Sequence, residues 1–487
     1  MSVCRMARSA AGSGCPVPLI TAIPMPLACH SAISRFSRYP PFSKSSISCE
    51  MTAIRRFEDI GKSAMHSDGK RHYNACFHGT SKSMLSALSI DLASRAFIRN
   101  PYPAYRQLRE ADGPFWLPQQ DRTGVEGIWL FSRYRDVSAI LRNTRSISKD
   151  ISRRVPAHRQ TAFDRMLLNM DPPEHTRLRA LLAPQFSVRR IAELEAGIES
   201  TVEVLLSAMA ASGEADFMAD FATRLPILVI ADIIGVPPQD MPLLKGWNDD
   251  LLSGLDSARA TPDERNRAEG SLQAMMRYLV ELIRQPGHAG DTVVGHLSQL
   301  QRERGEPTGD ELLSICLLLV LAGHETTVNL LGNGLLALLS NPGQMALLRE
   351  NPGLWPGAID EMLRFESPLQ RATFRITSES CRIGNCTLEE GQQVSAVIGA
   401  ANRDPDEFPS PDDFDVRRSP NQHLAFGAGV HKCLGERLAR LEARIAFGRL
   451  LARFPNMRLV DSEPDWQDKT LLRGLRSLRI RIGAKGR

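Results

Sequence analysis

The sequence predicts a mainly α-helical protein with small β-sheets (α+β), in which one long helix crosses the whole molecule. Residues 308–311 form a capping box, and the helix that they begin continues to about Asn341, a length on the order of 50 Å. Leucines and alanines recur at helical spacing from Cys433 to about Leu451, which indicates a second helix near the C-terminus. Strand-like runs such as residues 127–131 are short, so we expect only small sheets.

The length and composition allow a large buried core. The chain has 487 residues, of which 43% are hydrophobic, and length alone would suggest about three domains. However, the motifs described below extend from His175 to Cys433, and no linker rich in proline, serine or glycine separates them. We therefore expect residues 84–487 to form one domain.

Residues 1–83 differ from the rest of the chain. They carry eleven Lys and Arg residues against four Asp and Glu residues, a net charge of +7, which leaves −2 for the remainder. No helical or alternating pattern is sustained here, which predicts a disordered extension. A mitochondrial-type presequence is an alternative, because residues 1–49 contain no acid. The interpretation that we prefer is a mis-annotated start, with translation beginning near Met84.

Charge and cysteine content bear on partners and compartment. The nearly neutral remainder gives no reason to expect nucleic acid as a partner. Residues 1–83 contain no run of the roughly 20 apolar residues that a membrane span needs, so we expect no membrane anchor. Five of the nine cysteines lie in this segment, and Cys316, Cys381, Cys386 and Cys433 show no paired spacing. We expect a reducing, cytoplasmic setting without disulfides.

The first elements of the body alternate between helix and strand. A helix over residues 103–110 and another over residues 134–141 flank the strand pair around residues 127–131. Residues 146–165 are irregular and basic. This run could contact an anionic substrate, and a solvated loop explains it equally well.

Residues 171–179 open a helix, and Pro172 and Pro173 suit its first turn. His175 and Arg179 are four residues apart and therefore share one helix face. Two cations on one face could clamp a pair of carboxylates. An exposed basic face is the alternative.

The long helix carries a polar interruption near its centre. Residues 312–322 are nearly all apolar, and Gly323, His324, Glu325, Thr326 and Thr327 follow. Burying a carboxylate and two hydroxyls costs several kcal/mol unless these groups are paired or used, so the interruption favours a functional site. Hydroxyls that bond to carbonyls of their own helix are the alternative, and this explains Thr327 best. The interruption and the helix length both argue against a membrane span.

Glu361 and Arg364 form an acid–base pair at i, i+3 spacing. At the surface such a pair would stabilise a helix by only about 0.2 to 0.5 kcal/mol and would carry no functional information.

Cys433 lies where a glycine-rich loop feeds the first turn of a helix. Unpaired N–H groups and the helix dipole favour the thiolate at such a position, as do the neighbouring basic residues. Gly427, Gly429 and Gly435 would let the backbone approach a flat ligand closely. A thiolate over a planar cofactor suggests a haem iron.

Two other interpretations of Cys433 stay open. A single cysteine is more often a buried structural residue. His423, His431 and Cys433 could also belong to a zinc site, although this set lacks a fourth ligand and a C-x-x-C pair.

The stretch Phe426-Gly427-x-Gly429-x-His431-x-Cys433-x-Gly435 resembles the haem-binding signature of the cytochrome P-450 superfamily, in wording closest to its soluble bacterial members. The resemblance implies a P-450 fold with the long helix over haem b (iron protoporphyrin IX), and Cys433 as the proximal iron ligand. A thiolate ligand favours O–O cleavage.

The same resemblance gives roles to the other motifs. Ala322-Gly323-x-Glu325-Thr326 matches the oxygen-activation motif, in which Thr326 donates a hydrogen bond to bound dioxygen and Glu325 brings protons. Glu361 and Arg364, completed by Arg418, would form a buried network for folding and haem retention, whose disruption costs about 3 to 5 kcal/mol. Either Arg371 or Arg375 would bind a haem propionate, and spacing favours Arg375. The implied cofactor contacts are His175, Arg179, Ala322, Gly323, Arg375, His423, Phe426, Gly427 and Gly435.

The implied activity is that of a monooxygenase that inserts one oxygen atom from O2 into a lipophilic small molecule by hydroxylation or epoxidation. Substrate would lie between the long helix, the loop of residues 146–165 and a C-terminal hairpin at residues 471–478. A peroxygenase and a non-catalytic haem-binding sensor or carrier are the alternatives. Neither of these needs Glu325 and Thr326.

Electrons would come from a separate ferredoxin and its NAD(P)H-dependent ferredoxin reductase, because too little chain follows Cys433 for a flavin or iron–sulfur module. An acidic redox partner could meet four basic residues, or these could form a solvated helix face: Lys432, Arg437, Arg440 and Arg444. We expect a monomer.

Overall fold

The computed structural model describes residues 90–483, except residues 112, 119–126, 154, 156–159, 161–163, 212, 256–259, 289 and 374. The expectations for residues 1–83 lie outside the described residues. So does a large part of the run 146–165, which we expected to cover the substrate.

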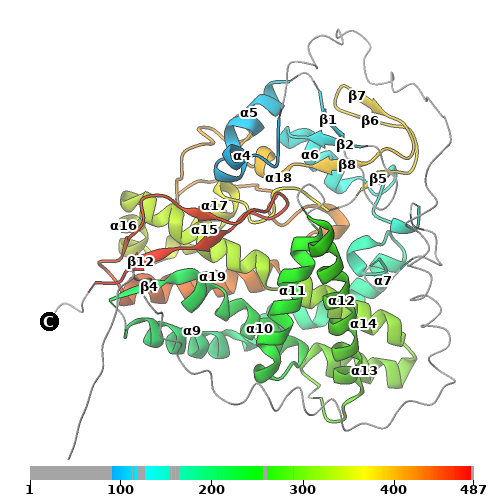
Figure 1. Ribbon diagram of the computed structural model, residues 1–487, viewed down its shortest axis with the longest axis horizontal. Helices are drawn as coiled ribbons and strands as arrows, with labels where there is room; N and C mark the ends of the chain where they lie inside the picture. The colour runs from blue at the N-terminus through cyan, green and yellow to red at the C-terminus, as the bar shows by residue number, and fades with distance from the viewer. Residues whose placement is uncertain are drawn as a thin grey trace, which may run out of the picture. The chain divides into compact units, whose positions relative to one another are not determined.

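A three-stranded sheet joins segments that are far apart in the sequence. β1 (Phe115–Pro118) pairs antiparallel with β2 (Gly127–Phe131), and β2 pairs parallel with β8 (Val394–Ala396). The helices α5 (Tyr102–Glu110), α6 (Tyr134–Arg142) and α18 (Ile398–Ala401) lie beside this sheet (Figure 1). The two predicted helices and the strand pair are confirmed, whereas the parallel partner β8 could not be predicted locally.

The other strands of the described residues are all two or three residues long. One three-stranded sheet has the order β4 (Glu214–Asp216), β12 (Arg479–Arg481), β9 (Arg458–Leu459). The remaining pairs are β3 (Ile147–Ser148) with β5 (Ile376–Thr377), β6 (Cys381–Ile383) with β7 (Cys386–Leu388), and β10 (Asp465–Trp466) with β11 (Leu475–Ser477). The β10–β11 pair contains part of the predicted C-terminal hairpin.

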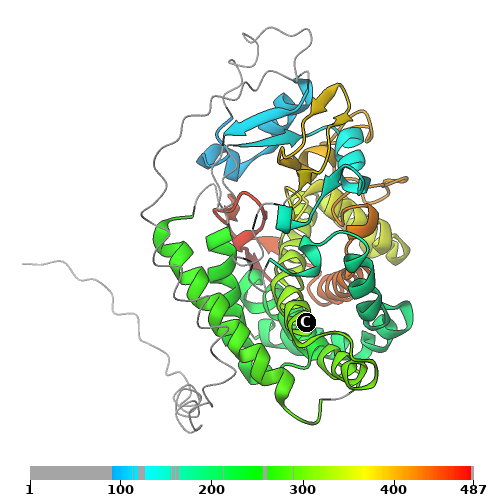
Figure 2. The ribbon, with the colours of Figure 1, turned by 90° about the vertical axis from the view of Figure 1, so that its right-hand side faces the viewer.

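Helices make up most of the fold. Figures 1 and 2 both separate the sheet β1–β2–β8 from a larger helical part, in which α11 and α12 lie side by side. The helices not yet named, apart from those of the central segment, are α4 (Arg95–Arg99), α7 (Glu174–Leu182), α8 (Val188–Glu193), α9 (Glu195–Met209), α10 (Arg224–Ile234), α11 (Met241–Leu255), α12 (Pro262–Arg284), α13 (Val293–Arg304), α16 (Pro342–Glu350), α17 (Trp355–Phe365) and α19 (Glu436–Arg453). The helix α7 begins after Pro172 and Pro173, not at them.

The predicted long helix is present but divided into two. α14 (Gly309–Ala322) begins with the predicted capping box, in which Glu311 N–H donates to Thr308 Oγ1 and Thr308 N–H donates to the Glu311 carboxylate. α15 (Glu325–Ser340) follows after Gly323 and His324. The segment Gly309–Ser340 is long and apolar enough to span a membrane, but 78% of its most apolar window is buried inside the protein. It therefore has the surroundings of a core helix.

The core forms around α15, which packs against α10, α17 and α19. Leu331, Leu335 and Leu338 on α15 are completely buried. A Cβ atom on Gly334 would lie 2.8 Å from Met362 Sδ and 2.9 Å from Phe447 Cζ. This glycine thus allows α17 and α19 to approach α15 closely, which connects the central helix to the helix that follows Cys433.

Candidate functional site

The Cys433 loop is held in shape by its own backbone and by α6. Cys433 N–H donates to Phe426 O at 2.8 Å, and Gly427 and Gly429 have φ of +69° and +71°, a conformation that favours glycine. A Cβ atom on Gly429 would lie 2.8 Å from Leu141 O, at the C-terminal end of α6. By contrast, nothing lies within 4 Å of a Cβ placed on Gly435. Gly427 and Gly429 therefore determine the backbone course of the loop.

Cys433 lies just before α19, as the sequence predicts. Its side chain is exposed to the space in front of the loop, yet surrounding protein desolvates the sulfur and raises the pKa of the thiol. The N–H of Gly435 and the positive charges of Arg179 and Arg440 act in the opposite direction, and Glu436 adds to the increase. The expectation of an easily ionised thiol is thus wrong for the protein alone, because desolvation outweighs the helix terminus.

A cluster of basic side chains lies next to this loop. The rings of His175 on α7 and His431 in the loop are 4.1 Å apart. Burial, and then the charges of Lys149, His175, Arg375 and Arg179, lower the pKa of His431 to about 2. Burial, and then Arg179, lower the pKa of His175 to about 4, which the charge of Asp171 partly opposes. We call these five residues the basic cluster: Lys149, His175, Arg179, Arg375 and His431.

The basic cluster fits a haem group. His175 Nδ1 and His431 Nε2 are buried and have no hydrogen-bond partner among the described residues. Buried polar atoms of this kind are rare and call for a partner. Two carboxylates would supply both hydrogen-bond acceptors and negative charge beyond that of Asp171, the acid whose charge acts on Lys149, His175 and Arg375. The adjacent loop carries Cys433, and a cysteine thiolate is one of the ligands that proteins provide for haem iron.

His423 does not join the basic cluster. Its Nε2 lies 3.2 Å from Asp360 Oδ1, and its Nδ1 accepts the N–H of Ala425 at 3.2 Å. Both ring nitrogens of His423 are therefore engaged within the protein, whereas His431 lies in the basic cluster. His423 and His431 contact different residues, which does not fit the alternative of a zinc site formed with Cys433. In the described part of the chain, no group of three His, Cys, Asp or Glu side chains could hold a metal ion.

The structure separates the two candidate arginines. Arg375 is buried, donates to Thr373 O at 3.1 Å and lies in the basic cluster. Arg371 donates from Nη2 to Thr470 Oγ1 at 3.0 Å. The cluster also includes Lys149, which no sequence motif indicated; only its proximity in the fold reveals it.

The polar residues of the central helix lie at the break between α14 and α15. Thr326 Oγ1 donates to Ala322 O at 3.4 Å, and Glu325, which is 7% exposed, pairs with Lys469 at 3.1 Å. Ala322 is exposed and Thr326 half-buried, although the residues around them on the helix are buried. These two residues therefore border open space inside the helical part.

Gly323 allows close packing at the break. A Cβ atom here would lie 2.4 Å from Leu319 O and 2.7 Å from Ile230 Cγ1. The absence of a side chain thus makes room for Ile230 on α10, and the cofactor contact that the resemblance implies for Gly323 stays a prediction.

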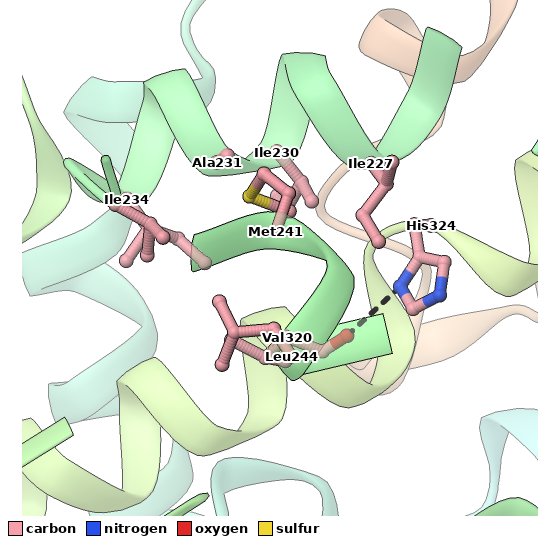
Figure 3. A pocket seen from close by; sticks show the side chains of 9 residues that line it. Ile227, Ile230, Ala231, Ile234, Met241, Leu244, Val320 and His324 are labelled. Carbon is pink, nitrogen blue, oxygen red and sulfur yellow. Dashed lines mark hydrogen bonds between the residues drawn. The ribbon is translucent and has the colours of Figure 1, made fainter. Parts of the chain in front are cut away.

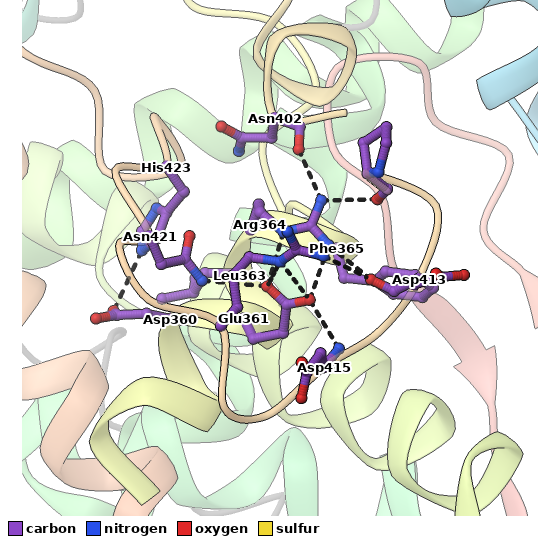
Figure 4. A network of polar contacts seen from close by, with 12 residues as sticks. Asp360, Glu361, Leu363, Arg364, Phe365, Asn402, Asp413, Asp415, Asn421 and His423 are labelled. Atoms are coloured by element: carbon purple, nitrogen blue, oxygen red, sulfur yellow. Dashed lines mark hydrogen bonds and ion pairs between the residues drawn. The ribbon is translucent and has the colours of Figure 1, made fainter. Parts of the chain in front are cut away.

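Glu361 and Arg364 form a buried pair, which Figure 4 shows with its neighbours, and Arg418 completes the network. Arg364 Nε and Nη2 donate to the Glu361 carboxylate at 2.7 and 2.8 Å, and Arg418 Nε donates to it at 3.1 Å. Arg364 also donates to the carbonyls of Asn402, Pro411 and Asp413, so it joins α17 to a long irregular segment. Asn421 Nδ2 donates to Glu361 from the stretch that leads into the Cys433 loop.

Most of the basic residues near Cys433 are already paired within the protein. Lys432 and Arg440 bind Glu436 at 2.7 and 2.9 Å, and Arg440 also binds Asp360 at 2.9 Å. Arg444 pairs with Glu195 on α9. A contact between this face and an acidic partner would therefore have to compete with these ion pairs, and Arg437 is the exposed cation for which no ion pair is found among the described residues.

Comparison with known proteins agrees with this geometry. The sequence model of the family described as Cytochrome P450 matches residues 354–476. Cytochrome P450 107B1 of Saccharopolyspora erythraea is 40% identical over 406 residues, 80% of this chain and 96% of that protein. Cytochrome P450 monooxygenase PikC of Streptomyces venezuelae is 38% identical over 405 residues, 81% of this chain and 94% of that protein.

A solved structure extends the likeness to the fold. P450BioI, in complex with hexadec-9Z-enoic acid ligated acyl carrier protein, matches with a TM-score of 0.73 and 36% identity, over 80% of this chain and 100% of that chain. The predicted fold class is thereby confirmed. The chain belongs to the cytochrome P450 superfamily and is a P450 monooxygenase with a haem-thiolate cofactor.

Proposed function

We propose that this monooxygenase inserts one oxygen atom from O2 into a lipophilic small molecule, by hydroxylation of a C–H bond or epoxidation of a double bond. Haem b, with a thiolate as iron ligand, would supply the activation of O2. The reaction consumes one O2, two electrons and two protons, and yields the oxidised substrate and one water. The basic cluster beside the Cys433 loop, with two orphaned histidine nitrogens, is the observation that carries this proposal.

Each part of the cofactor site has a proposed role. Cys433 would hold the iron, Phe426, Gly427 and Gly435 would contact the cofactor from the same loop, and Ala322 would contact it from the central segment. The basic cluster would bind the propionates, with His431 taking the role expected of His423. Glu361, Arg364 and Arg418 would stabilise the segment that presents the loop, because their network reaches it through Asn421.

Thr326 and Glu325 would handle the protons. The Thr326 hydroxyl borders the open space and donates its single proton to Ala322 O, so it would have to turn away from this carbonyl to donate a hydrogen bond to a ligand there. Glu325 is nearly buried, and its partner Lys469 has a side chain that is 18% exposed. Protons would thus pass from the Lys469 side through Glu325 to Thr326.

The partners and setting follow the sequence analysis. A separate ferredoxin and its NAD(P)H-dependent reductase would deliver the electrons to a monomeric, cytoplasmic enzyme formed by residues 84–487. Arg437, and the paired cations around it, would meet the ferredoxin.

A substrate carried by another protein is a second candidate, which the complex of P450BioI with a ligated acyl carrier protein favours. Difference spectra would decide between the two forms. Hexadec-9Z-enoic acid as the free acid and as the acyl carrier protein thioester would be added separately to the ferric enzyme. A spin-state change with the thioester only would favour carrier-bound substrate, and a change with the free acid would favour a small molecule.

The central test is the spectrum of the dithionite-reduced protein with carbon monoxide. The wild type should show the strongly red-shifted Soret band of a thiolate-ligated haem, and Cys433→Ser should lose it. Cys381→Ser is the matched control, because Cys381 is a half-buried cysteine on β6, outside the site. A wild-type band at the position typical of histidine-ligated haem would contradict the role of Cys433.

A further inference from the structure

The break between α14 and α15 interrupts the pattern of helical hydrogen bonds. Gly323 N–H donates to Leu319 O at 2.9 Å, and regular bonding resumes where Val328 N–H donates to His324 O at 2.9 Å. Between these bonds, two carbonyls that lack a backbone donor have a side chain nearby. His324 Nδ1 lies 3.1 Å from Val320 O, and Thr326 Oγ1 lies 3.4 Å from Ala322 O. Two side chains thus replace backbone donors at the point where the helix is broken.

The ring of His324 is enclosed by apolar side chains. It is 2% exposed and borders a small apolar cavity between α10, α11 and α14 (Figure 3). Ile227 and Ile230 come from α10, and Met241 and Leu244 come from α11. Because these surroundings offer few polar groups, the two ring nitrogens depend on specific protein partners.

The hydrogen bond between His324 Nδ1 and Val320 O determines whether Nε2 of the same ring donates or accepts. A carbonyl only accepts, so Nδ1 carries the proton; burial lowers the pKa of His324, which keeps the ring neutral near pH 7. Nε2 is then an acceptor, and Asn248 Nδ2 lies 3.3 Å from it. Asn248 is completely buried on α11, and its Oδ1 has no hydrogen-bond partner among the described residues. The bond to His324 is therefore what orients this amide.

We propose that His324 is a positioning residue, which keeps the α14–α15 break open by occupying Val320 O and ties the break to α11 through Asn248. Without the imidazole N–H, Val320 O would be free to accept the backbone N–H of residue 324, which is the regular i to i−4 bond. The helix would then close, and the carbonyl of Ala322 would turn away from Thr326. This inference rests on the proposed roles of Glu325 and Thr326.

The first test is structural and does not depend on turnover. In a crystal structure of haem-loaded His324→Leu, the N–H of residue 324 should come within hydrogen-bonding distance of Val320 O. In solution, exchange of the amides of residues 324–326 should slow about tenfold, the effect of one added net hydrogen bond. His324→Gln should keep the open break, because its amide can donate to Val320 O and accept from Asn248. An open break with wild-type exchange rates in His324→Leu would overturn the proposal.

The link to α11 is tested by a double-mutant cycle on the unfolding midpoint. His324→Leu and Asn248→Leu remove the same hydrogen bond, so their effects on stability should not add. The double variant should be about as stable as the less stable of the two single variants. Ser253→Ala is the control on α11, because among the described residues its hydroxyl bonds only to Asp249 O of the same helix. The shifts in unfolding midpoint caused by Ser253→Ala and His324→Leu should therefore add in the double variant. Full additivity of the Asn248 and His324 substitutions would refute the link. If His324→Leu does not fold, as judged by the reduced carbon monoxide spectrum, His324→Phe replaces it in both tests.

The functional readout separates this inference from the proposal on which it rests. Peroxide released per NADPH consumed should rise several-fold in His324→Leu and return to the wild-type value in His324→Gln. If Thr326→Ala leaves this ratio unchanged, the proposed role of Thr326 fails, whatever the helix break does. If the break stays open in His324→Leu, the inference fails, whatever Thr326→Ala shows.

Discussion

Lys469 Nζ lies 3.1 Å from Glu325 Oε1, so a residue near the C-terminal strand pair provides the countercharge for the carboxylate that precedes Thr326. The two side chains are 18% and 9% exposed and are separated by 144 residues in the chain. The C-terminal segment and the broken helix are thereby coupled at the proposed proton-delivery residues.

Lys469→Met should lower the free energy of unfolding by about 1 to 3 kcal/mol, because it leaves a nearly buried carboxylate without its partner. Lys469→Arg should retain most of the stability. Urea unfolding measures both. The control is Arg189→Ala, whose pair with Glu193 is exposed and should contribute nothing measurable. Equal midpoints for Lys469→Met and the wild type would mean that the ion pair does not stabilise the fold.

Thr326→Ala should release more hydrogen peroxide and less product per NADPH, because the hydroxyl beside Ala322 O is removed. Thr326→Ser restores a hydroxyl and should recover coupling. Thr327→Val is the matched control, since Thr327 is buried one residue further along α15. Unchanged coupling in Thr326→Ala would favour the peroxygenase or the haem-binding sensor or carrier instead.

Glu361→Gln should destabilise the protein by about 3 to 5 kcal/mol, because it removes the carboxylate that pairs with the fully buried Arg364 and leaves that guanidinium uncompensated. Arg417→Ala next to this network should cost at most about 1 kcal/mol, since its side chain is 60% exposed. Haem content per chain and urea unfolding measure the two effects. Similar losses for both variants would argue against a special role for Glu361.

Arg375→Gln should weaken haem retention about tenfold, the loss of one charge-assisted hydrogen bond, whereas Arg371→Gln should change it far less. The reason is that Arg375 lies in the basic cluster and Arg371 contacts Thr470. The rate of haem transfer to apomyoglobin measures retention. The opposite order of effects would give the propionate role to Arg371.

Glu442 predicts a pH dependence of stability. It is buried on α19, and burial raises its pKa to about 8. A carboxyl group with a raised pKa in the folded state binds more protons when the protein is folded. Its contribution to the free energy of unfolding is therefore fully present below the unfolded-state pKa of about 4.3 and is lost as the pH rises toward 8. Over that range the free energy of unfolding should fall by up to about 1.4 kcal/mol per pH unit. Glu442→Gln should therefore be more stable than the wild type at pH 8, with the difference shrinking toward pH 5. If the free energies of unfolding of Glu442→Gln and the wild type differed by the same amount at every pH, the buried Glu442 would not be the cause of the pH dependence.

Local patterns made most of the helical fold predictable. The capping box at Thr308, the helices around residues 103–110 and 134–141, and the helix after Cys433 depend on residues within a few positions of one another. The pair Glu361 and Arg364 and the face shared by His175 and Arg179 are local in the same sense. Spacing along a helix determines these relationships before any tertiary contact forms.

The partners of these residues were not predictable in the same way. The resemblance implied His423 as a cofactor contact, whereas the packing of α7 against the loop brings His431 to His175. Lys149 joins the basic cluster without any motif. The close approach of Ile230 on α10 to Gly323 is a contact that a sequence pattern within α14 cannot reveal.

The family, the order of the main helices and the positions of Cys433, Glu325 and Thr326 could be predicted from the amino-acid sequence, because each depends on neighbouring residues or on a short motif. Packing between distant segments sets which charges neutralise one another, which histidine lies in the basic cluster, and the contacts of Asn248 and Lys469 with the centre of the long helix. The physical reason is that burial and pairing depend on distances between segments far apart in the chain. Those distances are set by how whole helices pack.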